Sequence, residues 1–299
     1  MNFKKDKVLV VGASGIIGSY LATKLKKRYD ITSTGKTKFF DIDNYFSLDL
    51  TNISSIDSFI LNTPKFDTII FLVGLAHKKG TDKDYNEFLS INKMTLVNLM
   101  EKLDHKKKVP GKIIFFSSIS VYGERLKISS YNENLKKAPS SPYAVTKLEA
   151  ERYLKENFSL NSWILRVAPV YSSNFKLNVN RRIKLSHFLY RVGDGEKKLS
   201  LCNLKNIDLV IEGILNEKIP AGSYNISDNK VYTYNSLMNI KNKKFIFIIP
   251  SFLVLFLYHV GNIFRINFIK ENSLKLVSNN IFSSEKIRKF VKIPHVYKN

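Results

Sequence analysis

Cysteine is nearly absent from this chain of 299 residues, in which Cys202 is the single example. One thiol excludes an intramolecular disulfide framework and fits a reducing compartment. A secretory signal is missing as well, because the opening residues MNFKKDKVLVVGASG pass directly from charged to strand-like sequence, without an apolar h-region or a cleavage site. Both absences predict a cytoplasmic protein.

Acidic residues are scarce. Asp and Glu number 25 against 48 Lys and Arg, which gives a formal net charge of +23. This excess favours an anionic partner, such as a phosphorylated substrate, a membrane surface or nucleic acid. The basic residues are spread along the chain, however, and no RNP, zinc-finger or arginine-rich motif is present. Lys, Asn, Ile and Phe are abundant throughout, as an AT-rich coding sequence produces, so we expect generic phosphate affinity and no nucleic-acid partner.

Internal repeats and low-complexity linkers are also absent, and short apolar runs instead alternate with helical patterns. Such alternation predicts an α/β fold with a doubly wound parallel sheet and helices on both faces. After about residue 172 the rhythm loosens, which predicts a smaller α/β cap in 173–299, with elements of the main fold recurring near 200–227. The expected strands are 7–12, 30–35, 66–74, 111–123 (continuing into a loop) and 161–171, and the expected helices are 16–29, 84–104 and 141–158.

The segment 245–264 contains 20 residues without Asp, Glu, Lys or Arg. That length would suffice to span a bilayer, but Pro250 and three polar residues interrupt it, and a span would separate 265–299 from the fold to which its pattern belongs. Pro250 fits the first turn of a helix. We therefore expect a buried cap helix, with peripheral contact at the inner face of the membrane as the alternative.

A glycine-rich turn follows the first predicted strand, in the stretch VVGASGIIGSYLA. Gly12 lets the chain turn tightly, Gly15 lets the backbone approach a pyrophosphate, and Gly18 allows close packing of helix and strand. The helix that starts here offers amide donors and a positive dipole end to phosphates. The turn therefore predicts a dinucleotide site.

These glycines have the spacing GxxGxxG, and further motifs follow in order. As an ordered set they resemble the extended branch of the short-chain dehydrogenase/reductase family, the NAD-dependent epimerase/dehydratase type, over nearly the whole chain. The resemblance implies a Rossmann-type NAD(P)-binding domain in 1–172 and a mainly substrate-binding cap in 173–299. The further motifs are SLDLTN at 47–52, FLVG at 71–74, INKMT at 91–95, SSISVYG at 117–123, SPYAVTK at 141–147 and ILRVAPVY at 164–171.

Tyr143 and Lys147 lie four residues apart on a predicted helix, so that their side chains share one face. In the family, a tyrosine in this motif transfers the proton, the lysine lowers the pKa of that tyrosine and binds the cofactor ribose, and a serine hydrogen-bonds the carbonyl oxygen. The resemblance assigns the serine role to Ser118, which lies 25 residues before Tyr143. Ser117 and Ser120 stay open as alternatives.

The second predicted strand ends without a carboxylate. NAD-preferring members place an acidic residue there to hold the ribose 2′-OH, whereas this chain has Gly35, with Lys36 and Lys38 following. This predicts NADP(H), with NAD(H) as the alternative. The resemblance places the dinucleotide against Gly12, Ser14, Gly15, Ile16, Ile17, Gly18, Lys36, Asp49, Leu50, Val73, Gly74, Asn92, Tyr143, Lys147 and Val167.

Ile119 and Ser120 stand where sugar-nucleotide 4,6-dehydratases carry an acidic pair, so dehydration is not expected. The stretches 74–92 and 278–289 resemble bacterial enzymes that reduce a 4-keto-6-deoxy-N-acetylhexosamine nucleotide. This predicts NADP(H)-dependent reduction of such a nucleotide-diphosphate sugar in O-antigen or capsule synthesis, with no metal. The expected substrate contacts are Ser118, Ser120, Asn178, Arg181 and Lys198.

Two other functions stay open. One is an NAD-dependent 4-epimerase of a UDP-hexose or UDP-N-acetylhexosamine, of which some relatives act on a lipid-linked sugar. The other is a non-catalytic NADP-binding regulator, against which the intact Ser118, Tyr143 and Lys147 argue. A homodimer is compatible with the sequence, and the sugar and its stereochemistry at C4 are left open.

Overall fold

The computed structural model describes residues 5–37, 44–75, 84–126, 128, 130–238, 245–264 and 266–298. The chain forms two compact units that interleave along the sequence. The boundary predicted near residue 172 divides a cofactor-binding from a substrate-binding segment, which is a different division from that into compact units. It stays a prediction. Unit 1 contains Met1–Ser117, Val145–Leu165 and Pro220–Ser223, and unit 2 contains Ser118–Ala144, Arg166–Ile219 and Tyr224–Asn299.

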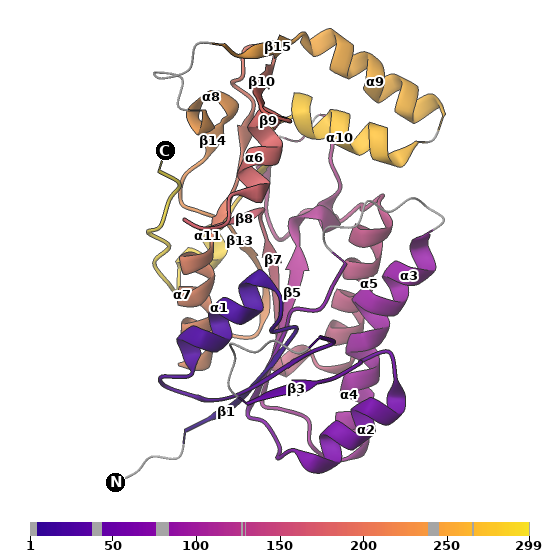
Figure 1. The fold of residues 1–299 in the computed structure, drawn as a ribbon, viewed down its shortest axis with the longest axis vertical. Coiled ribbons are helices and arrows are strands. Elements are labelled where there is room, and N and C mark those ends of the chain that lie inside the picture. Colours follow the sequence, from indigo (N-terminus) through magenta and orange to yellow (C-terminus); the bar gives the residue numbers. More distant parts are fainter. Residues whose placement is uncertain are drawn as a thin grey trace. The chain divides into compact units, whose positions relative to one another are not determined.

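A seven-stranded sheet is the framework, and the pairs of β1, β2 and β3 and of β1, β4 and β5 are parallel. Its order reverses between β1 and β4, which is the switch point where doubly wound sheets bind ligands beyond the strand carboxyl ends. The predicted α/β fold is confirmed. The strands in spatial order are β13 (Gly222–Ile226), β7 (Ser162–Val167), β5 (Lys112–Ser118), β4 (Thr68–Phe71), β1 (Lys7–Val11), β2 (Asp30–Gly35) and β3 (Tyr45–Ser47) (Figure 1).

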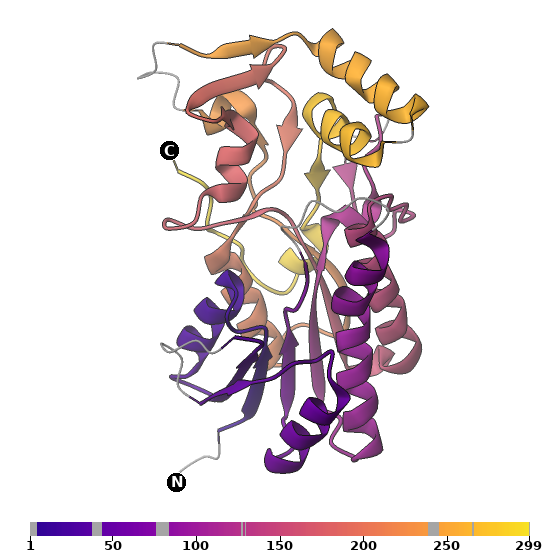
Figure 2. The same cartoon turned by 45° about the vertical axis from the view of Figure 1, so that its right-hand side comes forward.

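Helices cover both faces of this sheet in unit 1. Helix α1 (Ile16–Leu25) lies on one side, and α2 (Ile53–Asn62) and α4 (Thr95–His105) lie on the other (Figure 2). The central strands β1 and β4 are almost wholly buried, and side chains of β1, β4, β5 and β7 form one core with α2, α4 and α5 (Pro142–Asn157). This burial on both faces explains why the strand segments are continuous apolar runs. The remaining elements of unit 1 are α3 (Tyr85–Leu89), the π-helix η2 (Ser90–Met94) and the 3-10 helix η4 (Ser159–Asn161).

Unit 2 consists of short elements around a tyrosine-rich core that includes Tyr171, Tyr232 and Tyr234. Asp228 accepts hydrogen bonds from the hydroxyls of Tyr171 and Tyr232, which ties this core together. The elements of unit 2 are η3 (Ile119–Tyr122), β6 (Ser130–Tyr131), β8 (Val170–Tyr171), α6 (Leu177–Ile183), β9 (Lys184–Leu185), β10 (Phe188–Val192), β11 (Lys198–Leu199), β12 (Cys202–Asn203), α7 (Leu204–Leu215), β14 (Tyr232–Thr233), α8 (Tyr234–Leu237), β15 (Phe247–Ile249), α9 (Ser251–Ile263), α10 (Asn267–Val277), β16 (Ile281–Phe282) and α11 (Glu285–Arg288).

The prediction of a buried cap helix in 245–264 is wrong. A helix does begin directly after Pro250, but β15 precedes it, and α9 buries only Val254 and Gly261 among its side chains and glycines. Phe252 and Phe256 are 68% and 64% exposed. Within the described part of the chain, no helix combines the length and the hydrophobicity needed to cross a membrane.

Candidate active site

The turn after β1 has the backbone geometry that its glycines predict. Gly12 adopts a φ of 90°, a left-handed conformation that favours glycine, and its amide donates to the carbonyl of Thr34 at 2.9 Å. A Cβ on Gly18 would lie 2.4 Å from the carbonyl oxygen of Gly12, so only glycine lets α1 pack this closely. A Cβ on Gly12 would meet the amide of Val73 at 3.3 Å, which places the turn beside the end of β4.

The N-terminus of α1 is open to a ligand. Its N-cap residue Gly15 has no side-chain cap, and a Cβ there would meet only the Gly12 carbonyl oxygen, at 3.5 Å. Ser14, Gly15 and Ile16 are exposed and Ile17 is half-buried. Uncapped first-turn amides and a positive dipole end suit a pyrophosphate, so these residues fit a dinucleotide.

The end of β2 is covered by a side chain that the sequence did not indicate. A Cβ on Gly35 would lie 2.3 Å from the hydroxyl of Tyr45. This hydroxyl forms hydrogen bonds with Ser14 and with the carbonyl of Thr37. Gly35 therefore leaves room for the Tyr45 hydroxyl. The sequence pattern shows the missing carboxylate, but the packing partner lies ten residues further along and only the fold brings it there.

Lys36 and Asp49 form an ion pair at 3.0 Å, although Lys36 is largely exposed. Asp49 also accepts hydrogen bonds from the Thr51 amide and hydroxyl at 3.0 and 2.6 Å. These Thr51 bonds, with a smaller contribution from Lys36, lower the pKa of Asp49 to about 2. Leu50 beside it is buried, and its carbonyl accepts from Asn98. Lys38 lies outside the described residues.

Lys147 is 3% exposed, and its ammonium donates to the carbonyls of Val73 and Phe116 at 3.0 and 2.9 Å. It also lies 4.8 Å from the centre of the Phe115 ring. Burial lowers the pKa of Lys147 to about 7, and the Glu151 carboxylate partly opposes that shift. The loop after β4 and the end of β5 thus hold this amine between two strand ends of unit 1.

Asn92 is fully buried in the π-helix η2, and it joins the loop after β4 to helix α5. Its side-chain oxygen accepts from the Leu75 amide at 2.8 Å, and its amide nitrogen donates to the Thr146 hydroxyl at 3.0 Å. π-Helical turns are frequent at functional sites. A Cβ on Gly74 would lie 2.9 Å from the Lys147 ammonium and 3.2 Å from the Asn92 oxygen, so Gly74 leaves room for both.

Ser117 is separated from the other hydroxyls of its loop. Its hydroxyl donates to the fully buried carboxylate of Glu151 at 2.6 Å, a partner that sequence reasoning missed. Ser118, by contrast, hydrogen-bonds Tyr143 within unit 2 and lies 3.2 Å from the hydroxyl of Ser120. The structure therefore brings Ser118, rather than Ser117, to the tyrosine.

Tyr143 lies in the first turn of α5, four residues before Lys147, and the division between the units falls after Ala144. Burial raises the pKa of the Tyr143 phenol, and the Ser118 hydrogen bond only partly opposes that shift. This direction is opposite to the lowered pKa expected from the sequence. The raised pKa keeps the phenol protonated at neutral pH.

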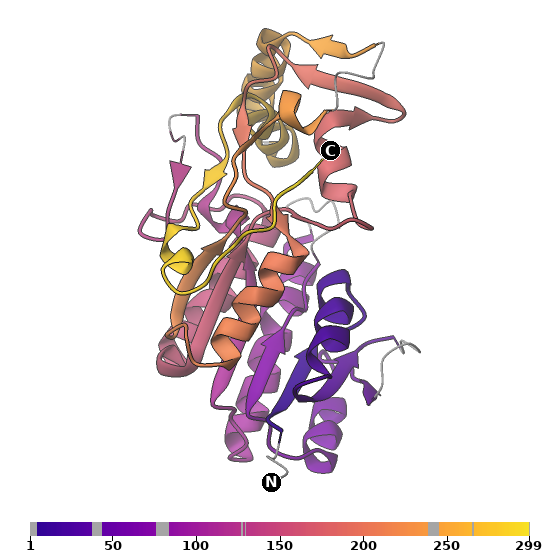
Figure 3. The same ribbon diagram turned by 90° about the vertical axis from the view of Figure 1, so that its left-hand side faces the viewer.

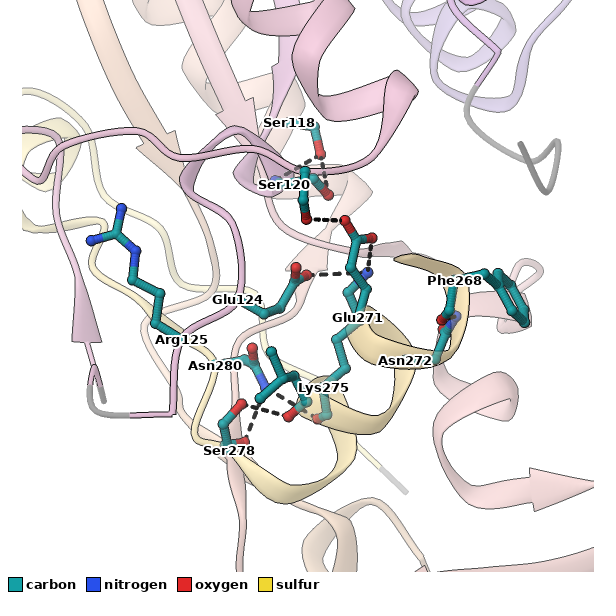
Figure 4. A network of polar contacts seen from close by, with 12 residues as sticks. Ser118, Ser120, Glu124, Arg125, Phe268, Glu271, Asn272, Lys275, Ser278 and Asn280 are labelled. Atoms are coloured by element: carbon teal, nitrogen blue, oxygen red, sulfur yellow. Dashed lines mark hydrogen bonds and ion pairs between the residues drawn. The ribbon is translucent and has the colours of Figure 1, made fainter. Parts of the chain in front are cut away.

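The largely buried carboxylate of Glu271 on α10 supports the start of α5, and no sequence motif indicated this role. Glu271 accepts hydrogen bonds from the Ser140 hydroxyl at 2.5 Å and from the Ser141 amide, two residues before Tyr143. Lys275 pairs with Glu124 at 3.1 Å and lies 3.8 Å from Glu271 (Figure 4). Burial, followed by the Glu124 carboxylate, raises the pKa of Glu271.

The other predicted substrate residues are dispersed within unit 2. The Asn178 amide donates to the Val170 carbonyl at 2.8 Å, which fixes it at the start of α6. Arg181 is exposed on the same helix, and Lys198 is exposed on β11, where its amide donates to Asn279. Of the predicted substrate residues, Ser118 and Ser120 hydrogen-bond each other. Val167, which was predicted to contact the dinucleotide, is buried at the end of β7.

The chain matches the model of the NAD dependent epimerase/dehydratase family over residues 8–208, so it belongs to that family. It is therefore a protein of the extended short-chain dehydrogenase/reductase type.

The chain is similar to curated proteins with two different activities. N-acetyl-alpha-D-glucosaminyl-diphospho-ditrans,octacis-undecaprenol 4-epimerase of Escherichia coli O157:H7 is 25% identical over 78% of this chain and 70% of its own. GDP-6-deoxy-D-mannose reductase of Pseudomonas aeruginosa is 26% identical over 56% of this chain and 52% of its own. The chain spans about half the length of several curated relatives that it matches.

Solved structures agree on the fold. The UDP-glucuronic acid 4-epimerase of Bacillus cereus in complex with NAD superposes with a TM-score of 0.72 at 22% identity, covering 97% of this chain and 94% of that one.

Proposed function

We propose that this protein reduces the C4 ketone of a nucleotide-diphosphate-linked hexose with NADP(H), as in the synthesis of bacterial surface polysaccharides. The observation that carries the proposal is the hydrogen bond between Ser118 and Tyr143, which brings a second hydroxyl to the phenol. A protonated tyrosine beside a second hydroxyl suits a reaction that delivers a proton to a developing alkoxide. The P. aeruginosa reductase supports this reaction class.

The chain's own residues then have distinct tasks. Tyr143 donates its proton to the C4 oxygen, and Ser118 hydrogen-bonds that oxygen as negative charge develops. Lys147, whose ammonium donates to the backbone carbonyls of Val73 and Phe116, would bind ribose hydroxyls. Gly12, Gly15 and the first turn of α1 would hold the pyrophosphate, and the nicotinamide supplies the hydride when bound.

The preference for NADP(H) is supported by the end of β2. Gly35 provides no carboxylate to repel a 2′-phosphate, and Lys36 is exposed. Its present partner is Asp49, but exposed ion pairs are worth only about 0–1 kcal/mol. A phosphate therefore competes readily for this lysine, whereas NAD(H) offers only a ribose hydroxyl there.

A second candidate is a 4-epimerase that acts on a lipid-diphosphate-linked hexose. The exposed apolar surface of α9 and the E. coli relative that acts on an undecaprenol-linked sugar favour it. The same Tyr143 would then remove and return a proton at the C4 oxygen, and the cofactor would not be consumed overall.

Identification of the nucleotide that copurifies separates these candidates. We expect exchangeable NADPH, consumed in equal amount with a 4-keto-6-deoxyhexose nucleotide. NAD that survives dialysis, together with interconversion of C4 epimers, would instead establish the epimerase.

Replacement of the tyrosine tests the catalytic assignment. Tyr143→Phe should lower turnover by at least about 100-fold, because general acid catalysis contributes that much, and it should weaken dinucleotide binding far less than that, because the aromatic ring is kept. Tyr153→Phe is the matched control, since Tyr153 lies on the same helix and packs on Phe158 instead. Full activity of Tyr143→Phe would exclude both enzymatic mechanisms.

A further inference from the structure

Unit 2 carries many exposed apolar side chains, which come from a small sheet and from the helix that follows it. Strands β15, β10 and β9 form one small sheet, and β15 leads through Pro250 into α9 (Figure 3). Soluble proteins rarely expose large contiguous apolar surfaces unless these bind something. We call this surface the apolar face; its members are Leu185, Phe188, Phe247, Ile248, Phe252, Leu253, Phe256 and Leu257.

Helix α9 presents its larger apolar side chains outward. Phe252 and Phe256 are one turn apart and exposed, as are Leu253 and Leu257. The inward side is held by α10, because a Cβ on Gly261 would lie 2.7 Å from the Lys270 amide. A surface helix of a globular protein normally shows the opposite arrangement. The apolar face is therefore a fixed feature of the packing between α9 and α10.

Exposed basic residues adjoin the apolar face in the sequence, and acidic residues are missing from the segments that form it. No Asp or Glu occurs in 176–193 or in 229–270, the segments that supply α6, β9, β10, α8, β15 and α9. Arg181 and Lys184 are exposed next to Leu185. Apolar groups bordered by cations are the features of a segment that lies in the interface of an anionic bilayer.

We propose that the apolar face docks unit 2 on an anionic membrane surface, with α9 lying in the interface plane. Helix α9 has 13 residues, or about 20 Å at the usual rise, which is shorter than the hydrocarbon core. Its phenylalanine and leucine side chains enter the acyl boundary, and the basic residues bind phosphate headgroups. This docking does not depend on which sugar the enzyme uses.

A second copy of the chain fits this face less well. In a symmetric dimer the same surface faces itself, so the basic border of one protomer would meet that of its partner without any acidic residue to pair with it. Anionic lipid headgroups complement that charge, which is why the bilayer is the favoured occupant.

Vesicle flotation tests the proposal with the full chain. We expect the protein to float with vesicles of phosphatidylcholine and phosphatidylglycerol, and to float less with phosphatidylcholine alone or at high salt. The double variant Phe252→Ser, Phe256→Ser should lower the partition coefficient by at least about tenfold, because two apolar side chains leave the interface. Leu160→Ser is the matched control, since Leu160 is 92% exposed but lies in unit 1.

The outcomes separate the occupants. Loss of flotation in the double variant, with flotation kept in Leu160→Ser and melting temperatures unchanged, supports membrane docking. Equal flotation of the wild type and the double variant, or no flotation of the wild type, overturns it. Sedimentation analysis adds a further outcome: a dimer that the double variant dissociates, without vesicle binding, would assign the face to a second copy.

Discussion

The buried ammonium of Lys147 should make the stability of this protein rise with pH. Its pKa is about 7 in the folded protein, against 10.5 for the unperturbed group. Between these values the unfolded chain binds a proton that the folded chain has released, so the free energy of unfolding increases with pH. The whole difference between these two pKa values corresponds to about 5 kcal/mol of unfolding free energy, because each pKa unit is worth about 1.4 kcal/mol.

The variant Lys147→Met removes this titration while keeping an unbranched side chain. Relative to the variant, the wild type should gain about 2 kcal/mol of unfolding free energy between about pH 7 and about pH 9. The absolute stability of the variant at one pH is less informative, because the carbonyls of Val73 and Phe116 lose their donor. The measurement is urea unfolding followed by the fluorescence of Trp163, the single tryptophan, which lies in unit 1 with Lys147.

An exposed lysine provides the control for this experiment. Lys27→Met, at a surface position of the same unit, should keep the wild-type pH dependence. If the free energies of unfolding of the wild type and of Lys147→Met change in parallel with pH, the ammonium is not desolvated as described and the reasoning fails.

Three further predictions concern the glycine turn and the support of Tyr143. Gly18→Ala should lower stability by about 1–3 kcal/mol through overpacking, because its Cβ meets the Gly12 carbonyl oxygen at 2.4 Å, and thermal unfolding measures this. Gly15→Ala should keep the melting temperature but weaken dinucleotide binding in titration calorimetry, since its Cβ has only one contact. Glu271→Ala should lower kcat more than it raises KM, because it releases the segment before Tyr143, whereas Glu271→Gln should retain most activity, since burial already disfavours the charged form.

Each of these predictions has a contradicting result. Equal melting temperatures of Gly18→Ala and the wild type would show that α1 shifts freely. Undiminished dinucleotide affinity of Gly15→Ala would move the pyrophosphate away from this turn. Wild-type kcat in Glu271→Ala would show that α5 begins correctly without that carboxylate.

Motifs and periodicity predicted the fold well where the signal is local. Strand β1 and helix α5 lie within a residue or two of their predicted ranges because apolar runs and helical spacing are properties of adjacent residues. The π-helical turn at Asn92 was not predicted, and there Asn92 hydrogen-bonds Leu75 and Thr146, which lie far from it in the sequence. The partners Tyr45, Glu151 and Glu271 were missed for the same reason.

The segment 245–264 shows the limit of composition as evidence. Its apolar content is compatible with burial, with a surface contact or with a span, and the sequence pattern favoured burial. The structure instead leaves most of α9 exposed. The buried positions of this helix are Val254 and Gly261, and Gly261 packs against α10.

The sequence by itself determined those features that depend on residues close together in the chain. Three glycines fix a turn by their lack of Cβ atoms, and Tyr143 and Lys147 share a helix face by their spacing of four. Only the tertiary structure decided which serine meets the tyrosine, which groups surround Lys147 and which face of α9 is exposed. Those outcomes depend on burial and on partners distant in sequence, and burial is what moves the pKa of a side chain or leaves an apolar surface uncovered.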